Sequence, residues 1–232
     1  MFKELQRNVR DRGPAPIVTW LSSTGRIELS TITFANAVSK AGNFLVDGLE
    51  LEESSKLNVN LGNHWQSPVW LATALCVGME LYDQAPILIS HSDAITTWTG
   101  AIDQLIVVGR DPFGMPEKDL PAGCINGSEE VRNFGDYFSP SWENLGVVLT
   151  FEEISYSWSE LVAMAESQRK QYGIEPGTRV GVAGNLDLLQ AVIYQVVMPI
   201  SFGISLVLID HVDPDIIEIT KQEKIAKFVS LI

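Results

Sequence analysis

Strand-like and helix-like segments alternate along almost the whole chain, and this alternation limits the possible folds more than any other feature. Short apolar runs predict strands at 17–21, 27–29, 57–61, 86–89, 104–108, 147–149, 179–183, 204–209 and 227–231. Helical spacing predicts helices at 66–79, 157–172, 188–198 and 214–223. A further helix is predicted after Ser30, a suitable N-cap, with Phe34 and Val38 on its apolar face. Such alternation gives mainly parallel sheets, so we expect an α/β fold.

The two halves of the chain resemble each other in the order of their landmarks. Each half has a serine before a helix, a Gly-Asn pair after a strand and an aspartate after a later strand. These are Ser30 and Ser157, Gly62-Asn63 and Gly184-Asn185, and Asp83 and Asp210. We therefore predict two similar βα lobes, residues 1–110 and 146–232, joined by a loop-rich connector at 111–145. One continuous sheet with accidental similarity is the alternative.

The composition allows an ordinary folded core. The 232 residues are 46% hydrophobic, which is enough for a core without metals or disulfides. Cys76 lies in an apolar stretch and Cys124 in a loop, so neither a disulfide framework nor a Cys-x-x-Cys metal site is indicated. The N-terminal segment 1–12 is charged and lacks the apolar core of a secretory signal. These features favour a cytoplasmic location.

Charge argues against two classes of partner. Twenty-nine acidic residues against 16 basic ones give a net charge of −13, which would repel nucleic acid and anionic membranes. Residues 188–209 carry no charge and could reach across a bilayer, but Pro199 and Gly203 interrupt them. We read this stretch as a buried helix followed by a buried strand, and expect neither nucleic acid nor membrane as a partner.

Several segments resemble acyl-CoA synthetases and other adenylate-forming, AMP-binding enzymes. Residues 172–182 (YGIEPGTRVGV) are similar to that family's G-x-x-P-G-D-R-V turn, and Gly173 and Gly177 suit its tight backbone. Four other segments are similar to parts of the family in the same order. Residues 24–30 resemble the DGRRLTY opening and residues 61–66 resemble LPNSPEF. Residues 146–150 resemble the strand after the phosphate loop, and residues 213–219 resemble a later helix. The resemblance is greatest to a short family that keeps only the N-terminal region. It implies the fold of the acyl-CoA synthetase N-terminal domain.

The departures from that family concern its chemistry. A glycine-rich loop ending in Pro-Lys-Gly holds the ATP phosphates in the family, but residues 137–145 (YFSPSWENL) contain no glycine or lysine and add Glu143. Residues 22–25 (SSTG) imitate part of such a loop, yet their flanks predict a hairpin turn. The family's magnesium-binding Tyr-x-x-Thr-Glu motif and the small C-terminal domain with a catalytic lysine have no counterpart. We therefore predict no catalytic residue, no metal and no cofactor.

Candidate ligand-binding residues lie where strands end, because ligands of α/β proteins bind at the carboxyl edge of the sheet. They are Gly62, Asn63, His64, Trp65, Asp83, Gly184, Asn185 and Asp187. His64 is the best polar candidate, but a capped turn with a partly exposed imidazole is the interpretation that we favour for it, because no companion motif accompanies it. His64, His91 and His211 are too scattered in sequence to indicate a metal site. Glu152 and Glu153 are predicted at a helix N-terminus.

The sequence leaves three kinds of function open. The first is a non-catalytic relative of adenylate-forming enzymes that binds an unknown small molecule or protein partner in the cleft between the lobes. The second is an enzyme subunit whose missing parts come from another chain. The third is a structural protein with a closed cleft, and self-association is left open in all three.

Overall fold

The structure is a computed structural model that describes residues 1–53, 55–93, 101–120, 122–140, 146–210 and 216–231. Its strands form two sheets, in the orders β12-β10-β11-β1-β2 (sheet A) and β7-β6-β5-β3-β4-β8-β9 (sheet B). Sheet A contains β1 (Pro16–Ser22), β2 (Gly25–Ser30), β10 (Arg179–Gly184), β11 (Ser205–Ile209) and β12 (Lys227–Leu231). Sheet B contains β3 (Lys56–Asn60), β4 (Glu80–Tyr82), β5 (Ile87–Ser90), β6 (Gln104–Val107), β7 (Ile125–Asn126), β8 (Val147–Phe151) and β9 (Ile154–Ser157). The described neighbouring strands are parallel except in the hairpins β1–β2 and β8–β9, so the predicted α/β fold with mainly parallel sheets is confirmed.

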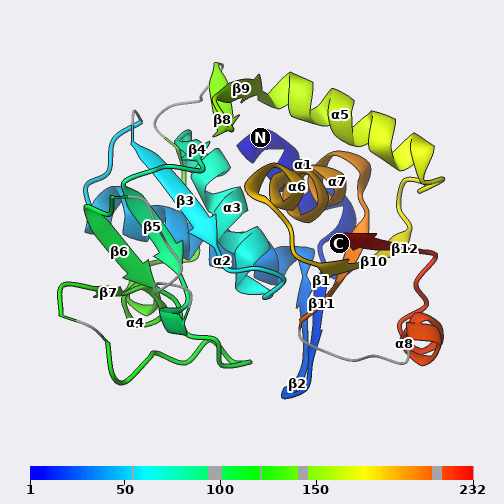
Figure 1. Ribbon diagram of the computed structural model, residues 1–232, viewed down its shortest axis with the longest axis horizontal. Helices are drawn as coiled ribbons and strands as arrows, with labels where there is room; N and C mark the ends of the chain where they lie inside the picture. The colour runs from blue at the N-terminus through cyan, green and yellow to red at the C-terminus, as the bar shows by residue number, and fades with distance from the viewer. Residues whose placement is uncertain (54, 94–100, 121, 141–145, 211–215, 232) are drawn as a thin grey trace.

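Helices fill the middle of the molecule and its flanks (Figure 1). They are α1 (Phe2–Arg12), α2 (Thr31–Asn43), η1 (Phe44–Gly48), α3 (Gln66–Val77), α4 (Gly127–Glu130), η3 (Val131–Asn133), α5 (Trp158–Gln171), α6 (Leu188–Ala191), η4 (Val192–Val197), α7 (Met198–Phe202) and α8 (Ile216–Gln222). Every residue of α3 and of η4 is buried. A helix that is buried on all sides belongs in the core, which explains why these two segments carry no charged residue.

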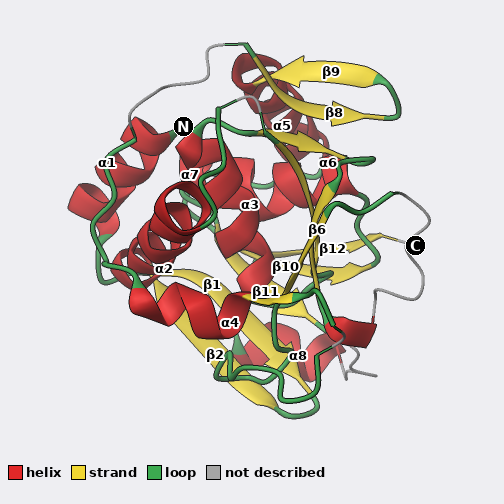
Figure 2. Cartoon of the chain, turned by 90° about the vertical axis from the view of Figure 1, so that its left-hand side faces the viewer, coloured by secondary structure: helices red, strands yellow, loops and turns green. Residues whose placement is uncertain are grey.

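The sheets do not follow the predicted division of the chain at residues 110 and 146. The hairpin β1–β2 comes from the first half but joins sheet A through β11, where Trp20 is paired with Leu208. The hairpin β8–β9 comes from the second half but joins sheet B through β4, where Leu81 is paired with Leu149. The hairpin of each half thus joins the sheet that consists mainly of strands from the other half. The two hairpins lie at opposite ends of the molecule (Figure 2).

The internal repeat predicted from the landmarks is confirmed by the strand order. The series β5-β3-β4-β8-β9 of sheet B matches β12-β10-β11-β1-β2 of sheet A in order and direction. The match extends to single hydrogen bonds: the backbone N–H of Asp83 donates to the carbonyl of Thr150, and that of Asp210 donates to the carbonyl of Leu21. Ser30 caps α2 with its hydroxyl group, as predicted, and Ser157 caps the corresponding helix α5 in the same way.

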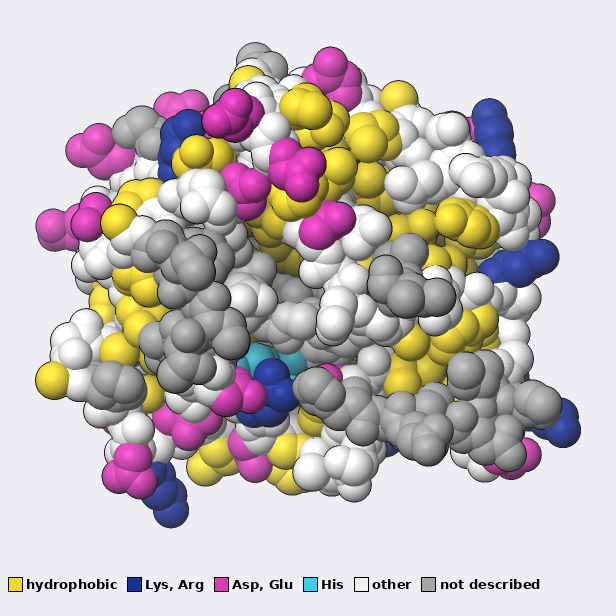
Figure 3. Space-filling view, viewed as in Figure 1, with side chains coloured by type: hydrophobic (Ala, Val, Ile, Leu, Met, Phe, Trp, Pro, Cys, Tyr) yellow, Lys and Arg dark blue, Asp and Glu magenta, His cyan; other side chains and the backbone are white. Residues whose placement is uncertain are grey.

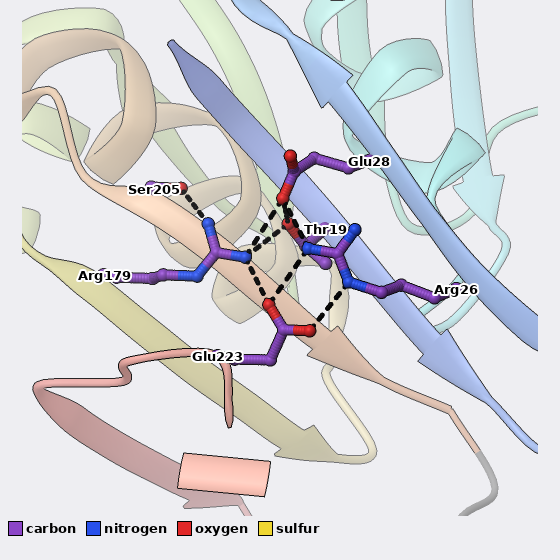
Figure 4. A network of polar contacts seen from close by, with 6 residues as sticks. All are labelled: Thr19, Arg26, Glu28, Arg179, Ser205 and Glu223. Carbon is purple, nitrogen blue, oxygen red and sulfur yellow. Dashed lines mark hydrogen bonds and ion pairs between the residues drawn. The ribbon is translucent and has the colours of Figure 1, made fainter. Parts of the chain in front are cut away.

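A polar network fastens the hairpin β1–β2 to the other half (Figure 4). The Arg179 guanidinium on β10 donates to Thr19 Oγ1 and Glu223 Oε2, both at 2.7 Å, and to Glu28 at 3.3 Å. Arg26 on β2 donates to Glu223 at 2.7 Å and to Glu28 at 2.7 Å. Strands from the first half and the residue after α8 are thereby tied to β10.

Two local predictions need correction, and one helix was not predicted. Glu152 and Glu153 form the turn between β8 and β9, with φ angles of 47° and 64°, because both ends of the turn pair as strands. The helix at 188 continues through Pro199 to Phe202; Pro199 lies near the start of α7, directly after the π-helical turn η4. The charged segment 1–12 forms α1, which buries Leu5.

The stretch 188–209 folds as predicted into a helix and then a strand. Gly203 ends the helix with φ 64°, and β11 is buried along its whole length in the middle of sheet A. Among the described residues, no helix is both long enough and apolar enough to cross a membrane. The absence of charge therefore reflects burial in the protein core.

Candidate ligand-binding cleft

The two Gly-Asn turns meet in one cleft between the halves of the molecule. Gly62-Asn63 follows β3 of sheet B and Gly184-Asn185 follows β10 of sheet A. The glycines have φ angles of 55° and 97°, a region that residues with a Cβ rarely adopt. The cleft has a volume of about 350 Å³ and is lined by Asn60, Leu61, Gly62, Asn63, Arg110, Gly184, Asn185, Leu186, Ile209 and Asp210.

Asn63 holds the two walls of this cleft together. Its Nδ2 donates to the carbonyl of Gly184 at 2.8 Å and to that of Ile209 at 3.3 Å. Gln195 on η4 donates to the carbonyl of Gly62 at 3.2 Å and to Asn63 Oδ1 at 3.5 Å. The side chain of Asn63 is buried, so its amide is engaged within the protein. Asn185, its counterpart in the second half, is exposed.

His64 is buried, so the expected partly exposed imidazole is wrong. The ring lies 4.7 Å from Trp20, 4.9 Å from His91 and 5.7 Å from Trp65, measured between ring centroids. Burial, helped by His91 and Arg110, lowers the pKa of His64 to about 3, so this imidazole is neutral at physiological pH. Two histidines that lie far apart in the sequence are therefore neighbours in the fold, while His211 lies outside the described residues.

A second cavity of about 320 Å³ adjoins the first and contains three of the predicted residues, Gly62, Asp83 and Asp187. Both carboxylates already have structural partners. Asp83 Oδ2 accepts the N–H of Glu152 at 2.9 Å and so supports the turn of β8–β9. Asp187 caps α6 by accepting the N–H of Gln190 at 2.8 Å. Their geometry thus explains them as a turn anchor and a helix cap.

Trp65 lies beside the cleft, under the loop that follows β6. A Cβ placed on Gly114 would meet the ring of Trp65 at 3.2 Å, which shows how closely this loop covers the indole. Gln66 donates to the carbonyl of Gly109 at 3.2 Å and fastens the same loop. The loop brings Arg110 to the cleft, a residue that the sequence analysis missed. Its position two residues after the predicted strand 104–108 was the available signal.

The segment that replaces the family's phosphate loop is described in part. Tyr137 is highly exposed and Phe138 is buried. Residues 141–145, with Glu143, lie outside the described residues, as do residues 211–215. Where the chain is described, no group of three or more His, Cys, Asp or Glu side chains is arranged to hold a metal ion.

Comparison with known proteins agrees with the fold. An acyl-CoA synthetase from Brucella canis matches with a TM-score of 0.79 at 11% identity, over 98% of this chain and 46% of that one. A mutant form of coronafacic acid ligase from Pectobacterium brasiliense matches with a TM-score of 0.73 at 13% identity, over 99% and 49%. The chain therefore spans about half the length of these two structures.

A curated relative has a similar length. A TIGR03089 family protein from Mycobacterium tuberculosis (strain H37Rv) is 27% identical over 214 residues, covering 88% of this chain and 86% of its own. No family model matches the sequence. The resemblance stated from the sequence is confirmed at the level of fold: the chain has the α/β fold of the N-terminal part of acyl-CoA synthetases.

Proposed function

We propose that this protein binds a small polar molecule in the cleft between its two halves and does not form adenylates. The observation that carries the proposal is the 350 Å³ cleft, which both Gly-Asn turns line together with Arg110 and Asp210. Its size is at the lower end of small-molecule sites, and its backbone and amide groups suit hydrogen bonding. The engaged side chain of Asn63 gives the cleft a fixed shape before a ligand arrives.

Ligand screening with a blocked cleft tests the binding. Asn185→Trp would place an indole at an exposed position on the cleft wall, and Ser167→Trp would place one on the exposed surface of α5. We expect compounds that bind the parent protein to lose at least about tenfold in affinity with Asn185→Trp and to keep it with Ser167→Trp. Equal binding to both variants would move the site away from this cleft.

The non-catalytic part of the proposal concerns ATP. Adenylation needs donors and cations that stabilise charge on the leaving pyrophosphate. In residues 137–145 the sequence supplies no lysine, and the whole chain has a net charge of −13. We expect calorimetry with ATP, with and without magnesium, to detect no micromolar binding. The isolated chain should not exchange pyrophosphate into ATP with short, long or aromatic acids, and robust turnover would refute this part.

A subunit of an adenylate-forming enzyme, completed by another chain, is the second candidate. It is favoured by the coverage of 46% and 49% of the matched structures. Under this alternative, protein purified with its native partners would exchange pyrophosphate while the isolated chain would not. The same measurement on both preparations separates the two proposals.

A further inference from the structure

Four aromatic nitrogen atoms beside the cleft are buried and make no hydrogen bond of normal geometry with the described residues, although the backbone of Arg110 lies near the His64 ring. They are Nε2 of His64, Nε2 of His91, Nε1 of Trp20 and Nε1 of Trp65. His64 is the common neighbour, with ring centroids 4.7 to 5.7 Å from the other three rings. Buried polar groups are nearly always paired, so a cluster of unpaired ones needs an explanation such as a ligand or ordered water.

The partners of the other ring nitrogens fix the tautomers of both histidines. His91 Nδ1 lies 2.7 Å from the carbonyl oxygen of Val108, which can only accept, so Nδ1 carries the proton and Nε2 a lone pair. His64 Nδ1 accepts the backbone N–H of Gln66 at 3.4 Å, so its proton is on Nε2. Burial lowers the pKa of both groups, which keeps them neutral. The pair therefore offers one donor and one acceptor.

This pair adjoins the proposed ligand site. His64 directly follows Asn63 in the wall of the cleft, and His91 follows Ser90, which is paired with Asn60 of the same wall. Figure 3 shows histidine side chains at the floor of a hollow near the middle of the molecule, beside basic and acidic side chains. Both rings are buried behind the lining residues, so a ligand reaches the histidines only if it extends beyond this lining.

The charges around the pair do not favour an anion. Arg110 lies 3.5 Å from Asp93, and Asp210 lines the same cleft, so among the described residues two carboxylates accompany one guanidinium. A carboxylate against His91 would also face the lone pair of Nε2, where it finds repulsion instead of a donor. A neutral group with an acceptor and a donor side by side would satisfy both histidines.

We propose that the Nε2 atoms of His64 and His91 bind a primary carboxamide, whose oxygen accepts from His64 and whose NH₂ donates to His91. This assignment rests on the proposed function, because it names the chemical class of the ligand in the same cleft. Trp20 and Trp65 enclose the amide with their rings. A neutral amide-bearing small molecule, and not the matching carboxylate, is then the preferred ligand.

Benzamide and benzoate are a matched pair of probes for this inference. By calorimetry or ligand-observed NMR we expect benzamide to bind at least about tenfold more tightly than benzoate or methyl benzoate. His64→Phe and His91→Phe should each remove this preference, whereas Tyr194→Phe, a buried change outside the cluster, should retain it. Circular dichroism of each variant shows whether it has folded.

Nitrogen-15 NMR of the imidazole rings tests the same inference in the unaltered protein. The free protein should show the Nε2–H tautomer for His64 and the Nδ1–H tautomer for His91, and benzamide should shift both Nε2 resonances. The inference would be overturned by tighter binding of benzoate or by the opposite tautomers. It would also be overturned if saturating benzamide left the Nε2 resonances unchanged, because the two nitrogens would then bind ordered water only. Cleft ligands that show no preference for amides would overturn it and leave the proposed function intact, while a cleft that binds nothing would overturn both.

Discussion

The two halves of the molecule have the same strand order, yet they use corresponding residues differently. Asn63 is buried and bridges the halves, whereas Asn185 at the matching position is exposed. The hairpin β1–β2 is fastened by a network of four charged side chains, and the turn of β8–β9 is supported by the Asp83 carboxylate. A repeated fold therefore does not make its matching residues equivalent, and the departure at Asn185 leaves a polar group on the wall of the cleft.

The largest expected difference is between the two asparagines. Asn63→Ala removes the bonds to the carbonyls of Gly184 and Ile209 and leaves polar groups near the core unpaired. We expect it to lower the free energy of unfolding by about 3 kcal/mol. Asn185→Ala should change it by less than about 0.5 kcal/mol, because that side chain is exposed. Urea unfolding followed by tryptophan fluorescence measures both, and equal losses would contradict the distinction.

The two hairpin attachments should also differ in strength. Arg179→Met removes a partly buried guanidinium that joins Thr19, Glu28 and Glu223, and should cost about 2 kcal/mol of stability. Asp83→Asn weakens one hydrogen bond to a turn and should cost about 1 kcal/mol. In 1 M salt the loss for Arg179→Met should shrink, because salt screens partly exposed charges. Equal losses at low salt would show that the network does not fasten its hairpin more firmly.

The pH dependence of stability tests the same network through its carboxylates. A hydrogen bond from Arg26 holds the pKa of Glu223 below its ordinary value despite burial. Burial raises the pKa of Glu28, but hydrogen bonds from Thr19 and Arg26 outweigh it and the net shift is downward. Groups with a lowered folded pKa stabilise the protein above their unfolded pKa, and this stability is lost as the pH falls through the folded pKa.

Glu223→Gln should therefore be less stable than the parent protein at pH 7, by about 1 kcal/mol. The difference should shrink as the pH falls below the ordinary glutamate pKa of about 4.3 and disappear below the lower pKa of the folded protein. Thermal unfolding of both proteins over a series of pH values gives this comparison. A difference that grows towards acid pH would mean that the carboxylate destabilises the fold.

Local structure was largely readable from the sequence, whereas the pairing of distant segments was not. Periodicity and local signals such as the cap at Ser30 predicted most helices and strands, because these signals act within a few residues. The exchange of hairpins between sheets was missed, since an apolar run indicates a strand but not its partner. The charged helix α1 was missed because few apolar positions mark its buried side.

In the candidate site, too, local features were predictable from the sequence and contacts between distant residues were not. The sequence placed both Gly-Asn turns at carboxyl edges, and the fold brings them into one cleft. It did not predict that Asn63 and His64 are buried, or that His91 and Arg110 lie beside them, because these contacts join residues that are far apart in the chain. Glu152 and Glu153 show the reverse error: a local helix signal was overridden by strand pairing on both sides.

The smallest expected effect concerns that turn. Glu152 and Glu153 have φ angles of 47° and 64°, which suit the Asn-Gly pair of a two-residue hairpin loop better than glutamate. Combining Glu152→Asn with Glu153→Gly should raise the free energy of unfolding by about 0.5 to 1 kcal/mol, because the strain of a positive φ is relieved. The hydrogen bond from the backbone N–H of residue 152 to Asp83 does not depend on the side chain at 152 and should persist.

Two control variants separate conformation from electrostatics in this chain of net charge −13. Glu153→Gln removes the negative charge at residue 153 without relieving its positive φ. Thr24→Gly at the other hairpin should lower stability, because Thr24 does not have a positive φ and added backbone freedom favours the unfolded chain. Gains of equal size from Glu153→Gln and from the Asn-Gly turn would attribute the effect to charge and refute the conformational argument.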